Sequence, residues 1–112
     1  MKRSSVMIPI SEIARFCRRW KIRELALFGS ALRDDFSPDS DLDILVDFDR
    51  DADWGLLEHI QMQQELQGLL HRSVDLITKR ALLRSPNWLR RREILETAQV
   101  IFPNPEEAYA MG

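Results

Sequence analysis

Hydrophobic residues recur at helical spacing in two segments of the chain, residues 9–20 and residues 53–70. Ser11 and Asp53 stand near the starts of these segments and are the expected N-caps, because short polar side chains accept hydrogen bonds from the first backbone N–H groups of a helix. The pattern therefore predicts two amphipathic helices. Their apolar stripes are Ile13, Phe16, Cys17 and Trp20 in the first, and Leu56, Leu57, Ile60, Leu66, Leu69 and Leu70 in the second.

Two short segments are typical of strands that end abruptly. Residues 25–28 are all hydrophobic and are followed by Gly29, which favours a buried strand and then a tight turn. Residues 99–102 predict a last strand, which Pro103 ends because proline has no backbone N–H to donate to a sheet.

Two further strands carry aspartates at alternate positions. Along residues 42–48, one face presents Leu42, Ile44, Val46 and Phe48, and the other presents Asp41, Asp43, Leu45 and Asp47. We interpret the first face as core and the second as acidic. Residues 73–77 show the same alternation, with Asp75 between Val74 and Leu76.

The remaining elements complete an α/β pattern. Ser85 and Pro86 predict the N-cap and first turn of a helix through Leu95, and Ser30 predicts the start of a short helix. The order is then helix, strand, short helix, strand, helix, strand, helix, strand. It predicts an α/β (α+β) fold, a mixed β-sheet of about four strands with helices packed against at least one face.

Length and composition fit a single domain. The chain has 112 residues, of which 45% are hydrophobic and 30% are charged, as in ordinary globular proteins. We expect one domain over residues 1–112, with a core over residues 9–102 and a loose tail over residues 103–112. No stretch approaches the roughly 20 apolar residues of a membrane helix, and no signal peptide is recognisable, so we expect neither membrane insertion nor export.

Charge and cysteine usage bear on partners and compartment. The net charge of −2 and the pI near 5.7 give no support for binding to nucleic acid. The single cysteine, Cys17, cannot form an internal disulfide, and its place on an apolar helical stripe favours a packed core thiol. A reducing, cytoplasmic location fits this usage.

The first candidate for chemistry is the pair Asp41 and Asp43. Residues two apart on a strand leave the same face, with Cα atoms about 6.5 to 7 Å apart. Two carboxylates this close repel unless a cation lies between them. Magnesium suits the pair because it takes a few carboxylate oxygens and leaves other positions to water and substrate phosphates. Alternating aspartates on a strand are also common on a plain solvated face.

Asp75 extends this cluster if its strand lies beside that of Asp41 and Asp43, about 4.8 Å away. It would then complete a site for two magnesium ions, one holding a triphosphate and one lowering the pKa of an attacking hydroxyl. Alternatively, Asp75 takes the proton of that hydroxyl itself.

A phosphate-binding turn is the other half of the predicted site. Gly29 and Ser30 place a glycine turn at the start of a helix, where backbone N–H groups and a serine hydroxyl can hold a phosphate. Arg33 lies about one helical turn later and either contacts the triphosphate or braces an aspartate. Taken alone, a glycine and a serine after a strand indicate only a turn.

The combined motif resembles a known family. Gly29-Ser30-Ala31-Leu32-Arg33, then Ser40-Asp41-Leu42-Asp43, then Asp75 resemble the signature of the nucleotidyltransferase superfamily that includes DNA polymerase beta, and in particular its small branch, the minimal nucleotidyltransferases. The resemblance extends from about residue 13 to residue 102. It implies a polymerase beta palm-like sheet, Asp41, Asp43 and Asp75 as metal ligands and catalytic residues, and Gly29, Ser30, Arg33 and Ser40 as nucleotide-binding residues, with ATP as substrate.

The resemblance also implies a partner. Minimal nucleotidyltransferases accompany a helical HEPN ribonuclease toxin, and act as the antitoxin by adenylylating a tyrosine of the toxin. A hetero-oligomer with such a toxin is the expected assembly, with a homodimer as a further possibility. The departure from the family pattern is at Asp34 and Asp35, which follow Arg33 where relatives often carry glycine.

Two alternatives stay open at this point. One is a non-catalytic binding module that neutralises its partner by forming a complex. The other is a nucleotidyltransferase acting on a small molecule such as an aminoglycoside. Candidate partner surfaces are the basic turn at Arg90, Arg91 and Arg92, an exposed Trp54 or Trp88, and the tail with Tyr109. We expect surface or capping roles for His59 and His71.

Overall fold

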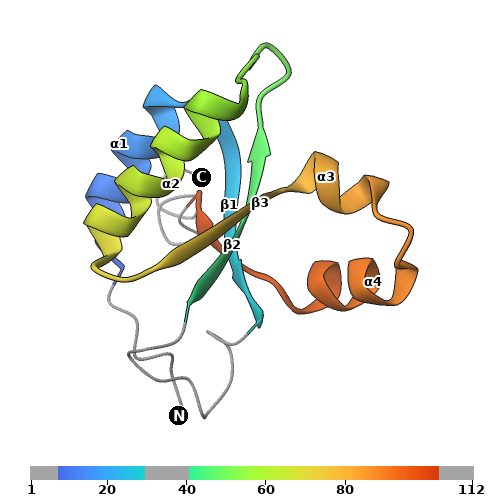
Figure 1. Ribbon diagram of the computed structural model, residues 1–112. Coiled ribbons are helices and arrows are strands. Elements are labelled where there is room, and N and C mark those ends of the chain that lie inside the picture. Colours follow the sequence, from blue (N-terminus) through green and yellow to red (C-terminus); the bar gives the residue numbers. More distant parts are fainter. Residues whose placement is uncertain (1–7, 30–40, 104–112) are drawn as a thin grey trace, which may run out of the picture.

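The computed structural model describes residues 8–29 and 41–103. The elements follow the predicted alternation of helices and strands, with one additional helix (Figure 1). Their bounds are α1 Ile10–Arg19, β1 Ile22–Phe28, β2 Leu42–Phe48, α2 Leu56–Leu70, β3 Val74–Thr78, α3 Lys79–Arg84, α4 Trp88–Thr97 and β4 Gln99–Phe102.

The four strands form one mixed sheet in the order β3-β2-β1-β4. β2 and β3 are parallel, whereas β1 is antiparallel to both β2 and β4. The C-terminal end of β1 and the N-terminal ends of β2, β3 and β4 therefore meet at the same end of the sheet. This arrangement confirms the predicted mixed α/β fold.

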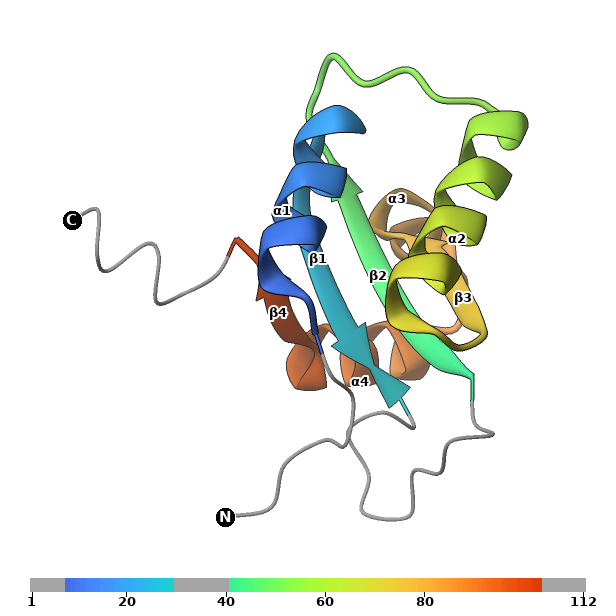
Figure 2. The same cartoon turned by 90° about the vertical axis from the view of Figure 1, so that its left-hand side faces the viewer.

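Helices α1 and α2 cover one face of the sheet, in front of the strands in Figure 2. The two helices are also tied to each other, since the Trp20 indole donates to Glu65 Oε1 at 3.0 Å and Arg19 pairs with the same carboxylate. Between them and the sheet lies the main core. Its fully buried side chains are Ile13, Phe16, Cys17, Leu25, Leu42, Ile44, Val46, Met62 and Leu66.

Helices α3 and α4 lie on the opposite face, so the fold has three layers (Figure 1). This face of β2 was predicted to be acidic, and that prediction is wrong at Leu45, which is buried. Leu45 belongs to a second apolar cluster together with Ala26, Phe28, Leu82 and Ile94. The acidic residues of β2 are therefore separated by a packed leucine, because α3 and α4 cover the middle of this face.

Two predicted helix starts are displaced in the structure. α1 begins at Ile10, and its N-cap is Pro9 and not Ser11, because proline already holds φ near the helical value (−77°) at the entrance. α2 has Gly55 and not Asp53 as its N-cap, and Glu58 Oε1 accepts the Gly55 backbone N–H at 2.9 Å.

The segment after β3 also differs from the prediction. Residues 79–84 form α3, a helix of only 6 residues that is capped by Thr78. Ser85 ends α3 and does not begin the next helix; the N-cap of α4 is Asn87, whose Oδ1 accepts the Arg90 backbone N–H at 3.1 Å. A helix of this length is too short to show periodicity, which is why it was missed.

Three further predictions concern boundaries. β1 begins at Ile22, three residues before the predicted start, because an irregularity in its pairing with β2 accommodates the polar residues 23 and 24. The predicted short helix at Ser30 and the tail from residue 104 lie outside the described residues.

Within the described ranges, each helix is too short or too polar to cross a membrane.

Candidate active site

The turn after β1 lies directly against the start of β2. Gly29 has φ +71°, in the left-handed region that residues with a side chain rarely adopt. A Cβ placed on Gly29 would stand 2.4 Å from Asp43 Oδ2. The Asp43 carboxylate therefore occupies the space that any side chain at position 29 would fill, so Asp43 lies directly against the backbone of the turn.

Asp75 stands beside Asp43 on the neighbouring strand. In the parallel pairing of β2 and β3, Asp43 is the partner of Asp75, and Leu42 is the partner of Val74. Paired residues of adjacent strands point to the same face, about 4.8 Å apart. The sequence predicted that Asp75 would lie next to the paired aspartates, and the register of the sheet agrees.

A pocket of about 560 Å³ opens between this end of the sheet and α4. Figure 2 shows α4 behind the sheet, level with the end of β1 and the start of β2. The volume is within the usual range for a site that takes a small ligand. Its lining residues are Phe28, Gly29, Asp43, Arg90, Glu93, Ile94, Thr97 and Gln99.

The remaining predicted site residues are less defined. Asp41 is exposed and directly precedes β2, while Ser30, Arg33 and Ser40 lie outside the described residues. Over residues 8–29 and 41–103, no three histidine, cysteine, aspartate or glutamate side chains are grouped, as they stand, to hold a metal ion. The sheet fixes the backbone positions of Asp43 and Asp75; the convergence of three carboxylates on a metal stays a prediction.

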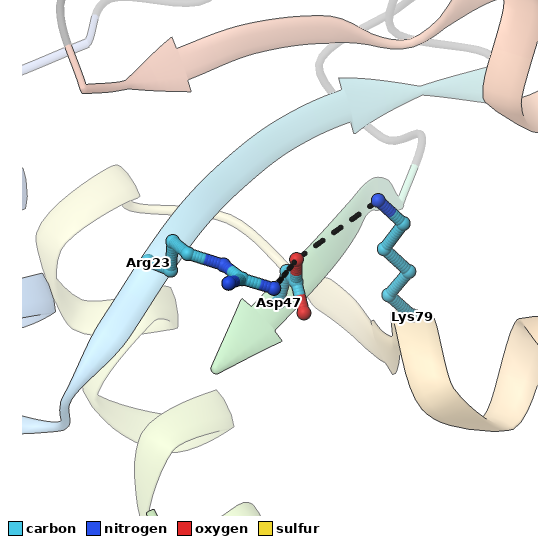
Figure 3. A network of polar contacts seen from close by, with 3 residues as sticks. All are labelled: Arg23, Asp47 and Lys79. Carbon is cyan, nitrogen blue, oxygen red and sulfur yellow. Dashed lines mark hydrogen bonds and ion pairs between the residues drawn. The ribbon is translucent and has the colours of Figure 1, made fainter. Parts of the chain in front are cut away.

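Asp47, the other aspartate predicted on this face, has a different role. Its Oδ2 lies 3.0 Å from the Arg23 guanidinium and 3.9 Å from Lys79 Nζ (Figure 3). Asp47 is thus held between β1 and α3 at the far end of β2 from Asp43. The two aspartates share a strand and a face, yet only Asp43 lies beside the glycine turn.

Sequence comparison identifies the family of this chain. The sequence profile of the nucleotidyltransferase domain matches residues 10–101. The chain belongs to the nucleotidyltransferase domain family. The matched range includes every element from α1 into β4, so the glycine turn, Asp43 and Asp75 all lie inside it.

Known proteins similar to this nucleotidyltransferase domain include the protein adenylyltransferase MntA of Thermococcus cleftensis, which is 42% identical over 64 residues. That match covers 57% of this chain and 63% of the relative. A chain of a toxin–antitoxin crystal structure with AMP-PNP has a TM-score of 0.64 at 20% identity, covering 89% of this chain and 77% of that chain.

A second solved structure has the same fold. It is tri-AMPylated Shewanella oneidensis HEPN toxin in complex with MNT antitoxin, and the matched chain has a TM-score of 0.56 at 20% identity, with 90% of this chain and 75% of that chain covered. At this identity the two structures bear on the fold alone. They agree with the expected mixed α/β fold, a four-stranded sheet with helices packed against it.

The basic turn of the nucleotidyltransferase domain does not form one surface. Arg91 donates to the Ser85 carbonyl, and Arg92 pairs with Glu96 at 3.0 Å on the outside of α4. Arg90, in contrast, lines the pocket beside Gly29 and Asp43. Arg90 was predicted to belong to a partner surface, but the structure places it at the candidate active site.

The predicted partner surfaces are only partly exposed. Trp54 is half-buried, since its ring packs edge-on against Trp20 with centroids 5.2 Å apart and its indole N–H donates to the Trp20 carbonyl. The prediction of an exposed Trp54 is wrong. Trp88 is exposed, as predicted, whereas Tyr109 lies outside the described residues.

His71 has the capping role expected of it, whereas His59 is half-buried against β3. His71 is the left-handed C-cap of α2, and its backbone N–H donates to the Gln67 carbonyl. His59 Nε2 lies 3.0 Å from the Leu76 carbonyl on the outer edge of β3, and it donates a hydrogen bond to this carbonyl when its proton is on Nε2.

Thr97 and Gln99 line the pocket together with Arg90, but nothing in the sequence pattern predicted a role for them there.

Proposed function

We propose that this chain is a protein adenylyltransferase that transfers AMP from ATP to a hydroxyl group, most simply a tyrosine, of a HEPN-type toxin, and thereby acts as the antitoxin of a toxin–antitoxin pair. The proposal rests above all on one observation: Asp43 and Asp75 are in register beside the Gly29 turn, in a chain of the nucleotidyltransferase family. The similarity to an adenylyltransferase gives the reaction, and the complexes of the same fold give the partner class.

Asp41, Asp43 and Asp75 would hold Mg²⁺ at this site. The donor chemistry fits, because carboxylate oxygens are the ligands that magnesium prefers, and a pocket lined by Gly29 and Asp43 opens beside this carboxylate. When bound, Mg²⁺ would supply positive charge against the triphosphate and acidify the acceptor hydroxyl. Two ions would suit a set of three carboxylates.

The side chains around Asp43 would bind and orient the substrates. The Gly29 turn lets phosphate oxygens approach backbone N–H groups, and we expect Ser30, Arg33 and Ser40 to add donors there. In the reaction, the acceptor oxygen attacks the α-phosphorus of ATP, the bond from that phosphorus to the β-phosphate bridging oxygen breaks, and pyrophosphate leaves. The proton of the acceptor hydroxyl passes to Asp75 or to solvent.

Mass spectrometry tests this proposal directly. The protein is mixed with ATP, Mg²⁺ and a HEPN-type toxin, and the mass of the toxin is followed over time. We expect the toxin to gain one AMP unit for each modified hydroxyl. An unchanged toxin mass with the wild-type protein would overturn the proposal.

Neutralisation by binding alone is the second candidate function. It is favoured by large apolar side chains exposed on α3 and α4, namely Leu83, Trp88 and Leu89, which would suit a protein partner. The double variant Asp41→Ala with Asp43→Ala separates the two functions. A pure binder still neutralises the toxin with both carboxylates removed, whereas an adenylyltransferase does not.

Location and assembly follow from this activity. An enzyme that uses ATP on an intracellular ribonuclease would act in the cytoplasm, and the buried free thiol of Cys17 is compatible with that compartment. A hetero-oligomer with the toxin is the expected assembly. Size-exclusion chromatography of the mixed proteins would reveal a complex if it outlasts the reaction.

A further inference from the structure

α4 presents one face to the candidate active site. Arg90, Glu93, Ile94 and Thr97 have the spacing i, i+3, i+4 and i+7, which places them along one side of a helix. All four line the pocket that also contains Gly29 and Asp43. One wall of the pocket is therefore the start of β2 with the glycine turn, and the other wall is α4.

The position of this helix face is fixed by packing. Ile94 is 6% exposed and packs with Phe28 and Leu45 in the second apolar cluster. The Arg91 side chain holds the carbonyl of Ser85, so the α3–α4 connection is tied to α4. Arg90 lies one turn before Ile94, on the side of the helix that lines the pocket.

The consecutive residues Arg90, Arg91 and Arg92 differ in their interaction partners. Arg91 and Arg92 are occupied by Ser85 and Glu96 respectively. Over residues 8–29 and 41–103, the guanidinium of Arg90 makes no ion pair within 4.0 Å. Its charge is available to a ligand that enters the pocket.

The charges around the pocket indicate which ligand that is. Asp43 and Glu93 line it, and Asp75 stands in register with Asp43, so an anionic substrate needs positive charge from the protein as well as from cations. A guanidinium presents a planar fork of N–H donors that matches two phosphate oxygens at once. Within the described lining of this pocket, Arg90 is the one cationic side chain.

We propose that Arg90 of α4 binds the polyphosphate of the nucleoside triphosphate from the wall opposite the Gly29 turn. The inference rests on the proposed function and adds a substrate-binding residue outside the family motif. α4 thus contributes to nucleotide binding as well as to the second apolar cluster. The triphosphate lies between the sheet edge and this helix, with Arg90 countering charge that Asp43 and Glu93 would otherwise repel.

NMR chemical-shift titration with the non-hydrolysable analogue AMP-PNP and Mg²⁺ tests the assignment. We expect Arg90→Ala to weaken binding by about ten- to a hundredfold, because a charged hydrogen-bonding partner of the phosphates is lost. Arg90→Lys, which keeps the charge but loses the fork, should give a smaller loss. Arg92→Ala is the matched control and should bind as the wild type does, since Arg92 faces outward and pairs with Glu96.

Adenosine is the second probe, because it has the base and ribose but no phosphate. Wild type and Arg90→Ala should bind adenosine with equal affinity. The inference is overturned if Arg90→Ala binds AMP-PNP like the wild type, if Arg92→Ala shows the same loss, or if the loss is as large with adenosine. If the wild-type protein itself binds no AMP-PNP, the proposed function fails. If the wild type binds AMP-PNP but Arg90→Ala binds it equally well, only the role of Arg90 fails.

Discussion

Gly29 is the residue on which the geometry of the site depends most. Its positive φ and the proximity of Asp43 are independent reasons why only glycine fits there. A larger residue would strain the backbone and displace the carboxylate at the same time. The glycine of the motif is therefore a requirement of packing as well as of phosphate approach.

We expect Gly29→Ala to abolish AMP transfer and to lower the free energy of unfolding by about 1 to 3 kcal/mol. The added methyl group would stand 2.4 Å from Asp43 Oδ2 and push the carboxylate aside. Urea unfolding and the toxin mass assay measure the two effects. Gly68→Ala in α2 is the control, because a Cβ there meets nothing within 4 Å; it should retain activity and gain about 0.5 to 1 kcal/mol of stability. Normal transfer by Gly29→Ala would contradict this account.

Cys17 is a residue whose chemistry is suppressed by its surroundings. Its side chain is fully buried in the main core. Burial raises the pKa of the Cys17 thiol to about 12, against a smaller lowering effect of Arg18. The folded protein therefore holds the thiol proton more tightly than the unfolded chain does, and the stability that this provides is lost as pH rises from the unfolded pKa, about 8.5, toward 12.

The native protein should accordingly resist iodoacetamide at pH 8 and react only after unfolding in urea. The free energy of unfolding should fall between pH 8 and pH 10, and fall less in Cys17→Ala, which has no thiol to ionise. Labelling rates followed by mass spectrometry, and urea titrations at the two pH values, check both statements. Rapid labelling of the folded protein would show that Cys17 is accessible.

At the scale of elements, α2 protects the outer edge of β3. Gln67 Oε1 and Gln63 Oε1 accept the backbone N–H groups of Val74 and Leu76, each at 3.1 Å, while His59 contacts the Leu76 carbonyl. These three side chains are spaced four residues apart, so they form one row along the helix. β3 is an edge strand, and unpaired edge groups invite association with other strands.

Gln63→Leu should therefore cost about 1 to 2 kcal/mol of stability, because it leaves the Leu76 N–H without its acceptor. It should also increase aggregation on heating. Gln64→Leu makes the same chemical change one position further along α2, where the side chain is exposed, and should leave both properties near wild type. Thermal denaturation with light scattering compares the two variants, and equal behaviour would contradict the protective role of the row.

The elements themselves were largely predictable, and the exceptions have physical causes. The alternation in residues 42–48 predicted β2 with its bounds, because one face of that strand is uniformly apolar. α3 was missed because a helix of 6 residues shows too little periodicity. Leu45 was assigned to the acidic face because the residues two positions before and after it are aspartates. It is buried by Leu82 and Ile94, which lie far along the chain, and the local pattern does not predict that contact.

At the scale of the whole molecule, the topology separates two acidic ends of one sheet face. Asp43 lies beside Gly29 and Asp75, whereas Asp47 is paired with Arg23 and Lys79. The sequence motif named the aspartates and the glycine, since their spacing is local. It did not identify Arg90 as a pocket residue, because that depends on how α4 folds back across the sheet.

These two ends should respond differently to the same substitution. Asp43→Asn should abolish AMP transfer, because a neutral amide lacks the negative charge with which the carboxylate would hold a divalent cation. Asp47→Asn should retain transfer and lose at most about 1 kcal/mol of stability, because Arg23 is largely exposed. Rates of toxin modification decide the comparison. Equal rates for the two variants would remove the distinction.

The central claim is the location of the cation and triphosphate, and paramagnetic broadening measures it most directly. Mn²⁺ is added with AMP-PNP to the ¹⁵N-labelled protein, and loss of amide signal is recorded along the chain. The account predicts the strongest broadening at Gly29, Asp43 and Asp75, with much weaker effects near Asp47, about 13 Å further along β2. Broadening centred on Asp47 and Lys79, or equal at both ends of the sheet, would contradict it.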